Sequence, residues 1–166
     1  MAGALIVTAE LAPADLAWLD RLRRAHYPAE RNRLPAHLTL FHALPPSLES
    51  EARHRLALAA KGKPPRASVA GIMDLGGGVA FRVVSDDLDA IRDSLSEAFH
   101  GMLSAQDSGG WRPHVTIQNK VRPVLAKTVL TALSRDFTPR EVEIAGLASW
   151  HYRGGPWDAH SRHMFA

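Results

Sequence analysis

The stretches AHLTLF (residues 36–41) and PHVTIQ (residues 113–118) repeat one pattern, in which a histidine is followed by an aliphatic residue, a threonine and a second aliphatic residue. Short runs rich in β-branched and aromatic residues predict strands, so each stretch is predicted to form one. Chance pairing of nine histidines with six threonines in 166 residues would give roughly 0.3 His-x-Thr triplets. Two are present, each with aliphatic residues at its second and fourth positions, so the duplication is a specific signal.

Side chains alternate along a strand, and this places His37 with Thr39 on one face and His114 with Thr116 on one face. The aliphatic residues between them point to the opposite face and would anchor each strand in the core. Each strand therefore presents an imidazole and a hydroxyl about 6–7 Å apart, given a rise of ~3.3 Å per residue. If the two strands are neighbours in one sheet, two His-Thr pairs line one cleft.

The residues around the two motifs predict a mixture of helices and strands. Hairpins separate several of the helices, and no linker divides the chain into independent domains. This order favours an α+β fold with a mainly antiparallel sheet over a doubly wound parallel sheet. Strands are predicted at 4–9, 36–42, 67–74, 78–84, 114–119, 140–151 and 157–165, helices at 14–25, after Ser47 as N-cap, from Asp86 onward and at 123–133, and a Ser/Gly-rich loop at 104–112.

The composition is that of a folded protein with a modest positive charge. The chain has 166 residues, 46% of them hydrophobic and 22% charged, which suits one domain with a buried core. Cysteine is absent, which excludes disulfides, thiol catalysis and cysteine metal sites and fits a cytoplasmic location. No apolar run is long enough to span a bilayer, and residues 1–8 fit a first strand better than a signal peptide. The formal net charge of +3 permits a nucleotide or RNA ligand without requiring one.

A pair of histidines suits the chemistry of phosphodiesters. One group must take a proton from the attacking hydroxyl or water, and another must protonate the leaving oxygen. An imidazole can do either, because its ordinary pKa is ~6.5. His37 and His114 are the candidate catalytic pair, and the hydroxyls of Thr39 and Thr116 are candidate ligands of the non-bridging phosphate oxygens. This chemistry requires no metal ion and no cofactor.

Two other functions are compatible with the same residues. A metal-dependent hydrolase would need further ligands, and the sequence contains no HExxH motif, no cysteine and no tight His-x-His pair beside His37 or His114. A non-catalytic module could bind a nucleotide or RNA in the same cleft, although binding alone does not require two histidines. The sequence therefore favours the enzyme over both alternatives.

Three further side chains are candidate substrate contacts. Phe41 and Gln118 lie two positions beyond each threonine, so strand alternation places both on the catalytic face, where they would contact a base or phosphate or close the cleft. Tyr152 precedes a glycine turn and would stack on a base or cover the core. His42 has core-facing parity and is interpreted as a structural histidine at the end of its strand.

The motifs HLTL at 37–40 and HVTI at 114–117, together with the preceding Arg112-Pro113, resemble the 2H phosphoesterase superfamily, specifically its 2′-5′ RNA ligase-like and cyclic phosphodiesterase branch. The resemblance implies one bilobal domain over residues 1–166. Its two interleaved lobes would be related by a pseudo-two-fold axis, with mainly antiparallel central sheets flanked by helices and a cleft between the lobes. It also implies that the two histidines are catalytic and that the two threonines bind phosphate.

The activities implied by this resemblance are opening of 2′,3′-cyclic phosphates to 2′-phosphates, cleavage of 2′-5′-linked substrates and reversible 2′-5′ RNA ligation without ATP. The expected partner is a small nucleotide or an RNA end that contains a phosphodiester, with no membrane and no obligate protein partner. The roles of the two histidines exchange between cleavage and its reverse. For hydrolysis of a 2′,3′-cyclic phosphate we expect His114 to activate water and His37 to protonate the 3′ oxygen.

Overall fold

The computed structural model describes residues 3–166 and confirms the predicted α+β class. Helices are interspersed among the strands along the chain, and every pair of neighbouring strands is antiparallel. The strands are β1 (Ala4–Leu11), β2 (Leu38–Leu44), β3 (Arg66–Asp74), β4 (Val79–Val84), β5 (His114–Gln118), β6 (Arg140–Tyr152) and β7 (Asp158–Met164), and the helices are α1 (Pro13–His26), α2 (Glu49–Ala59), α3 (Asp86–Ala98), α4 (Ala105–Ser108) and α5 (Pro123–Arg135).

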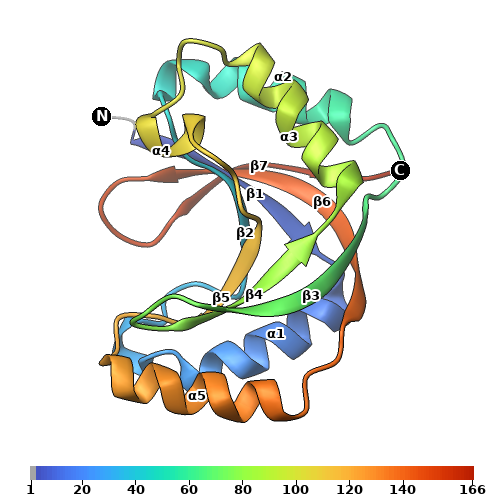
Figure 1. Cartoon of the computed structure of the whole chain (residues 1–166). Coiled ribbons are helices and arrows are strands. Elements are labelled where there is room, and N and C mark those ends of the chain that lie inside the picture. Colours follow the sequence, from blue (N-terminus) through green and yellow to red (C-terminus); the bar gives the residue numbers. More distant parts are fainter. Residues whose placement is uncertain (1–2) are drawn as a thin grey trace.

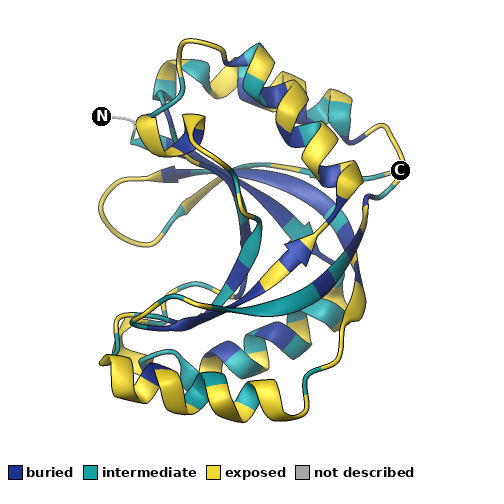
Figure 2. Ribbon diagram, in the orientation of Figure 1, coloured by how far each residue is buried: buried dark blue, intermediate teal, exposed yellow. Residues whose placement is uncertain are grey.

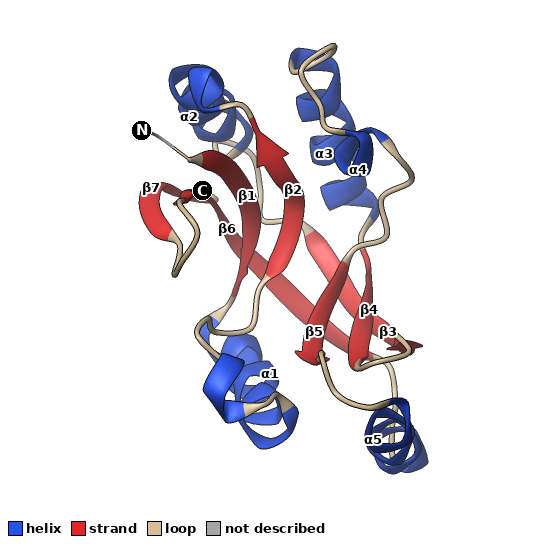
Figure 3. Ribbon diagram, turned by 90° about the vertical axis from the view of Figure 1, so that its left-hand side faces the viewer, coloured by secondary structure: helices blue, strands red, loops and turns tan. Residues whose placement is uncertain are grey.

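The strands form one sheet in the order β1-β2-β5-β4-β3-β6-β7, and β1 pairs in addition with β6. The strands β1, β2, β5, β4, β3 and β6 therefore form a closed circuit of neighbours. The long strand β6 pairs with β3 through residues 140–143 and with β1 through residues 144–152. Figure 3 shows β6 running behind the other strands, so that it connects the half of the sheet that contains β1 and β2 with the half that contains β3, β4 and β5.

An internal repeat relates the two halves of the sheet. In the first half the chain runs from β1 through α1 to β2, and in the second half it runs from β4 through α3 to β5. Each motif strand pairs with the strand that precedes its helix, β2 with β1 and β5 with β4. The helices α1 and α5 lie at one end of the molecule and α2 and α3 at the other, with β2 and β5 between them (Figure 1).

The core lies between the sheet and these helices. The aliphatic residues of the two motifs are fully buried there, as predicted, and Leu38, Leu40, Val115 and Ile117 are each 0% exposed. Exposed residues follow the outer sides of α1 and α5 and the connection between β6 and β7 (Figure 2). Within residues 3–166, no helix combines the length and the apolar character that a membrane span requires.

Two local predictions are wrong. Ser47 does not cap α2, because residues 46–48 form a 3-10 turn and the helix begins at Glu49. The predicted loop at 104–112 contains the short helix α4, whose N-cap Ser104 accepts a hydrogen bond from the backbone N–H of Asp107. A serine followed three residues later by an acidic residue is a known helix-start signal, so the sequence did contain the information for α4.

Candidate active site

The two motif strands meet at one pair of residues, Leu38 of β2 and Val115 of β5. Residues paired in an antiparallel ladder follow one another in opposite directions along the two strands. The next positions outward therefore place Thr39 across from His114 and His37 across from Thr116. The four polar side chains are related by a local two-fold axis through the Leu38–Val115 pair, and each histidine faces the threonine of the other motif.

All four side chains line one cavity of about 170 Å³. This volume is several times the ~30 Å³ that a water molecule occupies in the liquid, so the cavity has room for a phosphate group. The structure thus brings the two predicted catalytic residues and the two predicted phosphate ligands together. The complete lining is Ile6, His37, Thr39, His42, His114, Thr116 and Trp157.

Each motif histidine is oriented by a carbonyl two residues before it. The Nδ1 atom of His37 lies 2.9 Å from the carbonyl oxygen of Pro35, and Nδ1 of His114 lies 2.7 Å from that of Arg112. A carbonyl oxygen can only accept, so Nδ1 carries the proton in both rings. The Nε2 atom of each ring is then left available for proton transfer.

The environment of His37 disfavours its charged form. Burial lowers the pKa of His37 from 6.5 to about 4, and the positive charge of Arg23 and the neighbouring His114 add to this effect, while the hydrogen bond to Pro35 opposes it. The indole of Trp157 covers the ring edge-on, with 4.8 Å between the ring centroids. His37 is therefore neutral near pH 7 in the unliganded protein, which is the form that a general base requires.

A β-bulge follows the threonine in both motif strands. One step along β1, from Thr8 to Val7, corresponds to two steps along β2, from Thr39 to Phe41. In the same way, Ala80 and Val79 of β4 pair with Thr116 and Gln118 of β5. A bulge inserts one extra residue and reverses the faces of the residues that follow it.

The bulges explain where Phe41 and Gln118 lie. Phe41 is 0% exposed and packs edge-on against Phe99, and Gln118 is 4% exposed, so both are buried and neither is among the residues that line the cavity. Their placement on the catalytic face assumed an uninterrupted alternation, which the extra residue in each strand breaks.

Strand alternation predicted that the side chain of His42 points into the core. Beyond the bulge it instead lines the cavity. Its side chain is 42% exposed, and Nδ1 lies 3.2 Å from Oδ1 of the buried Asp107. Burial alone would raise the pKa of Asp107, but hydrogen bonds from the ring and backbone of His42 and from the Ala43 N–H lower it to about 2. Asp107 is therefore an ionised acceptor that fixes His42 at the cavity, so the predicted core-facing position of His42 is wrong.

A family model described as the 2′-5′ RNA ligase superfamily matches residues 11–156, which is most of the chain. The chain belongs to this superfamily. A search of curated proteins finds no match to the sequence. Among solved structures, the fold is similar to that of TT0787 from Thermus thermophilus, with a TM-score of 0.67 and 15% identity over 98% of this chain and 97% of that one.

Two structures of LigT from E. coli are also similar to this chain. LigT complexed with 3′-AMP has a TM-score of 0.58 and 17% identity, with 100% of this chain and 99% of that chain covered. LigT complexed with phosphate has a TM-score of 0.54 and 17% identity, with 99% and 98% covered. At these identities the likeness shows the shared fold, and it agrees with the 2H phosphoesterase resemblance of the two motifs.

In this superfamily member, two buried arginines hold the backbone at the two bulges. Arg23 of α1 donates from Nη1 to the carbonyl of Thr116 at 2.9 Å, and Arg92 of α3 donates from Nε to the carbonyl of Leu40 at 3.1 Å. A bulge leaves ladder groups unpaired, and a buried unpaired carbonyl is costly. Burial lowers the pKa of both guanidinium groups, but arginine stays charged at any physiological pH.

Of the remaining aromatic candidates, Tyr152 is 46% exposed at the end of β6 and is not among the residues that line the cavity. The aromatic side chain in contact with His37 is instead Trp157, which follows the glycine turn. Sequence reasoning missed Trp157 because no strand or helix period connects residue 157 with residue 37. Only the fold brings the β6–β7 connection to the cavity.

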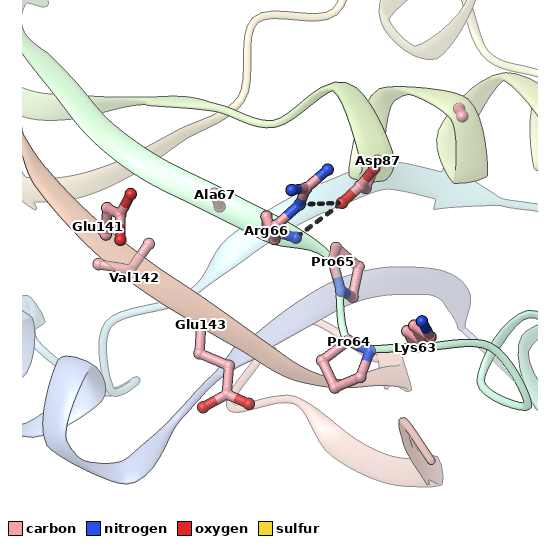
Figure 4. Close-up of a pocket in the computed structure, with 10 residues that line it drawn as sticks. Lys63, Pro64, Pro65, Arg66, Ala67, Asp87, Glu141, Val142 and Glu143 are labelled. Atoms are coloured by element: carbon pink, nitrogen blue, oxygen red, sulfur yellow. Dashed lines mark hydrogen bonds and ion pairs between the residues drawn. The ribbon is translucent and has the colours of Figure 1, made fainter.

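One further cavity adjoins the histidine cavity, and another lies apart from it. One of about 280 Å³ shares Thr39, His42 and His114 with the histidine cavity and extends it toward Trp111 and Arg92. A larger one, of about 920 Å³, lies elsewhere, between the starts of β3 and α3 and the first residues of β6. Its lining residues include no histidine, and Figure 4 shows an ion pair between two of them, Arg66 and Asp87, whose Nε and Oδ2 atoms lie 3.7 Å apart. Its size alone does not make it the catalytic site.

Proposed function

We propose that this superfamily member is a metal-independent phosphoesterase that acts on 2′,3′-cyclic phosphates or 2′-5′-linked nucleotides through His37 and His114. The observation that carries the proposal is the two-fold arrangement around the Leu38–Val115 pair, in which each histidine faces the threonine of the other motif across one cavity. General acid/base attack on phosphorus needs two proton-transfer groups on opposite sides of the phosphate, and the presence of both histidines in one cavity supports this role for them. The 166 residues would act as one domain with one motif in each lobe.

The lowered pKa of His37 favours this residue as the base, which reverses the assignment expected from the sequence. His37, with a pKa of about 4, is neutral and presents the Nε2 lone pair. In hydrolysis of a 2′,3′-cyclic phosphate, Nε2 of His37 takes a proton from water as the water oxygen bonds to phosphorus. The bond from phosphorus to the 3′ oxygen breaks, and His114, protonated at Nε2, gives its proton to that oxygen. The hydroxyls of Thr39 and Thr116 donate to the non-bridging oxygens.

The adjoining cavity gives the nucleoside a place beside the phosphate. Because the two cavities share Thr39, His42 and His114, a phosphate between the histidines leaves its nucleoside directed toward Trp111. The Asp107 carboxylate accepts from Nδ1 of His42, which leaves Nε2 of His42 free to accept a hydrogen bond from a ribose hydroxyl. We therefore assign His42 to substrate binding, not to proton transfer at phosphorus.

The test is an assay of the purified protein on 2′,3′-cyclic nucleotides and 2′-5′-linked dinucleotides, with chelator present and ATP absent. We expect conversion of the cyclic phosphates to 2′-phosphates, identified by phosphorus NMR, which distinguishes the 2′ from the 3′ product. Tight binding of these compounds without turnover would instead support a non-catalytic nucleotide-binding module. Activity that disappears with chelator and returns with metal would contradict the two-histidine mechanism.

A further inference from the structure

A second cluster of polar side chains lies outside the catalytic cavity, at the first residue of α2 and on the hairpin formed by β6 and β7. It consists of Glu49, His151 and His160, and one ligand atom from each lies within 4.8 Å of the others. Oε2 of Glu49 is 3.2 Å from Nε2 of His151 and 3.9 Å from Nε2 of His160. Both imidazoles are largely buried, with 8% and 9% of their side chains exposed, and the helix packs on both strands.

The hydrogen bonds of His160 determine which of its ring nitrogens carries the proton. Arg53 donates from Nη2 to Nε2 of His160 at 3.0 Å, and arginine has no acceptor to offer in return. The proton of the ring must therefore be on Nδ1, which lies 2.9 Å from Oγ of Ser149. Nε2 of His160 therefore carries a lone pair, which accepts from the cationic Arg53 and lies 3.9 Å from the Glu49 carboxylate.

The surroundings of His151 show the same preference for a cation. Its Nε2 faces the carboxylate of Glu49, and its Nδ1 faces the carbonyl oxygen of Gly3 at 3.4 Å. Both neighbours are acceptors, so a neutral ring, which carries a single proton, leaves one of the two nitrogens against an acceptor without a hydrogen bond. A metal ion between Nε2 and the carboxylate is one cation that removes this conflict, and it leaves the Nδ1 proton for Gly3.

We propose that Glu49, His151 and His160 form a binding site for a divalent transition metal of the zinc type. Two imidazoles and a carboxylate are a ligand set that zinc uses, with a water molecule in the fourth position. At tetrahedral zinc, ligand atoms lie about 3.3 Å apart, a spacing that the His151–Glu49 pair already has and that the His160–Glu49 pair reaches by closing roughly half an ångström. The Nδ1 contacts to Ser149 and Gly3 are the outer hydrogen bonds that orient metal-bound histidines.

Metal binding would affect two neighbouring parts of the structure, the Arg53 side chain and the connection between β6 and β7. Arg53 must leave Nε2 of His160, and because its side chain is exposed on α2 it can turn into water. His151 and His160 also flank the connection between β6 and β7, which carries the Trp157 that covers His37. A bound metal would therefore join α2 to the base of this connection and stabilise it, without entering the acid/base step.

The inference is tested by binding, which is independent of any catalytic activity. Chelator-treated protein is titrated with Zn²⁺ by calorimetry, and the Co²⁺ form is recorded by visible spectroscopy. We expect one Zn²⁺ per chain, the strong visible bands of tetrahedral Co²⁺, and a rise in Tm of about 5 °C or more at saturating metal. Glu49→Gln and His160→Ala should each weaken binding at least about tenfold, whereas Arg53→Ala should strengthen it by removing a competing cation.

The matched control is His54→Ala, which removes an exposed histidine one residue from Arg53 on α2 and should leave the affinity unchanged. A His37→Ala/His114→Ala double variant should also retain the metal. Absence of stoichiometric binding in the unaltered protein would overturn the proposal, as would equal affinities in Glu49→Gln and the unaltered protein. Because Glu49 is exposed at the start of a helix, its glutamine variant is expected to fold even if the His160 variant does not.

Discussion

The two motif strands are alike up to the bulge and differ beyond it. His37, immediately before β2, and His114, the first residue of β5, each donate to the carbonyl two residues earlier. In both strands a threonine follows on the cavity face, and a buried arginine binds a carbonyl at the bulge. After the bulge β2 continues to His42, which lines the cavity, whereas β5 ends at the buried Gln118. In the proposed mechanism, the duplicated part carries out proton transfer to and from the phosphate, and the part present only once contacts the rest of the substrate.

The largest expected effect comes from breaking the duplicated part. We expect His37→Ala and His114→Ala each to lower kcat by about 10²–10⁴-fold on a 2′,3′-cyclic nucleotide, because each removes one of two proton-transfer groups. Because the two rings act on one transition state, the double variant should be little worse than either single variant. Steady-state kinetics on the three variants measures this.

His26→Ala is the control for this pair, since His26 ends α1 and is not among the residues that line the cavity. It should retain the activity of the unaltered protein. If either single variant kept most of its kcat, the assignment of both histidines to catalysis would be wrong.

The next largest effect tests whether the two bulges are held equally. Arg92 also donates to Ser96 and to the carbonyl of Asp107, so it makes more hydrogen bonds than Arg23, which donates to Asn32 and Thr116. We expect Arg92→Met to lower the free energy of unfolding by about 2–3 kcal/mol and Arg23→Met by about 1–2 kcal/mol, because each leaves buried carbonyls unpaired. Urea denaturation measures both, and Arg24→Met, on the exposed side of α1, should change stability by less than about 0.5 kcal/mol.

The parts of this site that could be predicted from the sequence are those that depend on local periodicity. The His-x-Thr duplication and strand alternation placed His37, Thr39, His114 and Thr116 on one face, because the four positions precede the bulges. Beyond the bulges the same rule misplaced Phe41, Gln118 and His42. A bulge depends on how two strands pair, and that pairing is not encoded in the period of either strand alone.

The contributions from distant segments could not be predicted for a different reason. Trp157 reaches His37 from the far end of the chain, and Arg23 reaches Thr116 across 93 positions. The Trp157 contact depends on the pairing of β1 with both β6 and β2, and the Arg23 contact depends on the packing of α1 against β5. Asp107 is intermediate, because the Ser104 capping signal predicts its helix but not its contact with His42.

We expect a smaller effect from removing His42, the side chain by which β2 and β5 differ at the cavity. His42→Ala deletes the ring that only β2 brings to the cavity, and we expect KM for a cyclic nucleotide to rise about tenfold with kcat nearly unchanged, since one hydrogen bond to the ribose is lost. Asn119→Ala, just beyond the end of β5, is the matched change on the other strand and should alter KM by less than about twofold. A fall in kcat as large as that of the His37 variant would mean that His42 takes part in proton transfer.

The smallest expected effect concerns Trp157, whose indole covers the His37 ring and so influences its pKa. Because the folded-state pKa of His37 is about 4 and its ordinary value is 6.5, the folded protein binds fewer protons than the unfolded chain between these values, so stability falls as pH drops from 6.5 through 4. The acid limb of kcat/KM should follow the same group and lie near pH 4.

Trp157→Ala admits water to the His37 ring. The His37 pKa, followed by proton NMR, should therefore rise by about half a unit or more, and the acid limb of kcat/KM should shift upward with it. Tyr152→Ala removes an exposed ring from the same hairpin and should leave both unchanged. An acid limb that stays near pH 4 while the NMR pKa rises would show that a group other than His37 sets this limb, and would contradict His37 as the base.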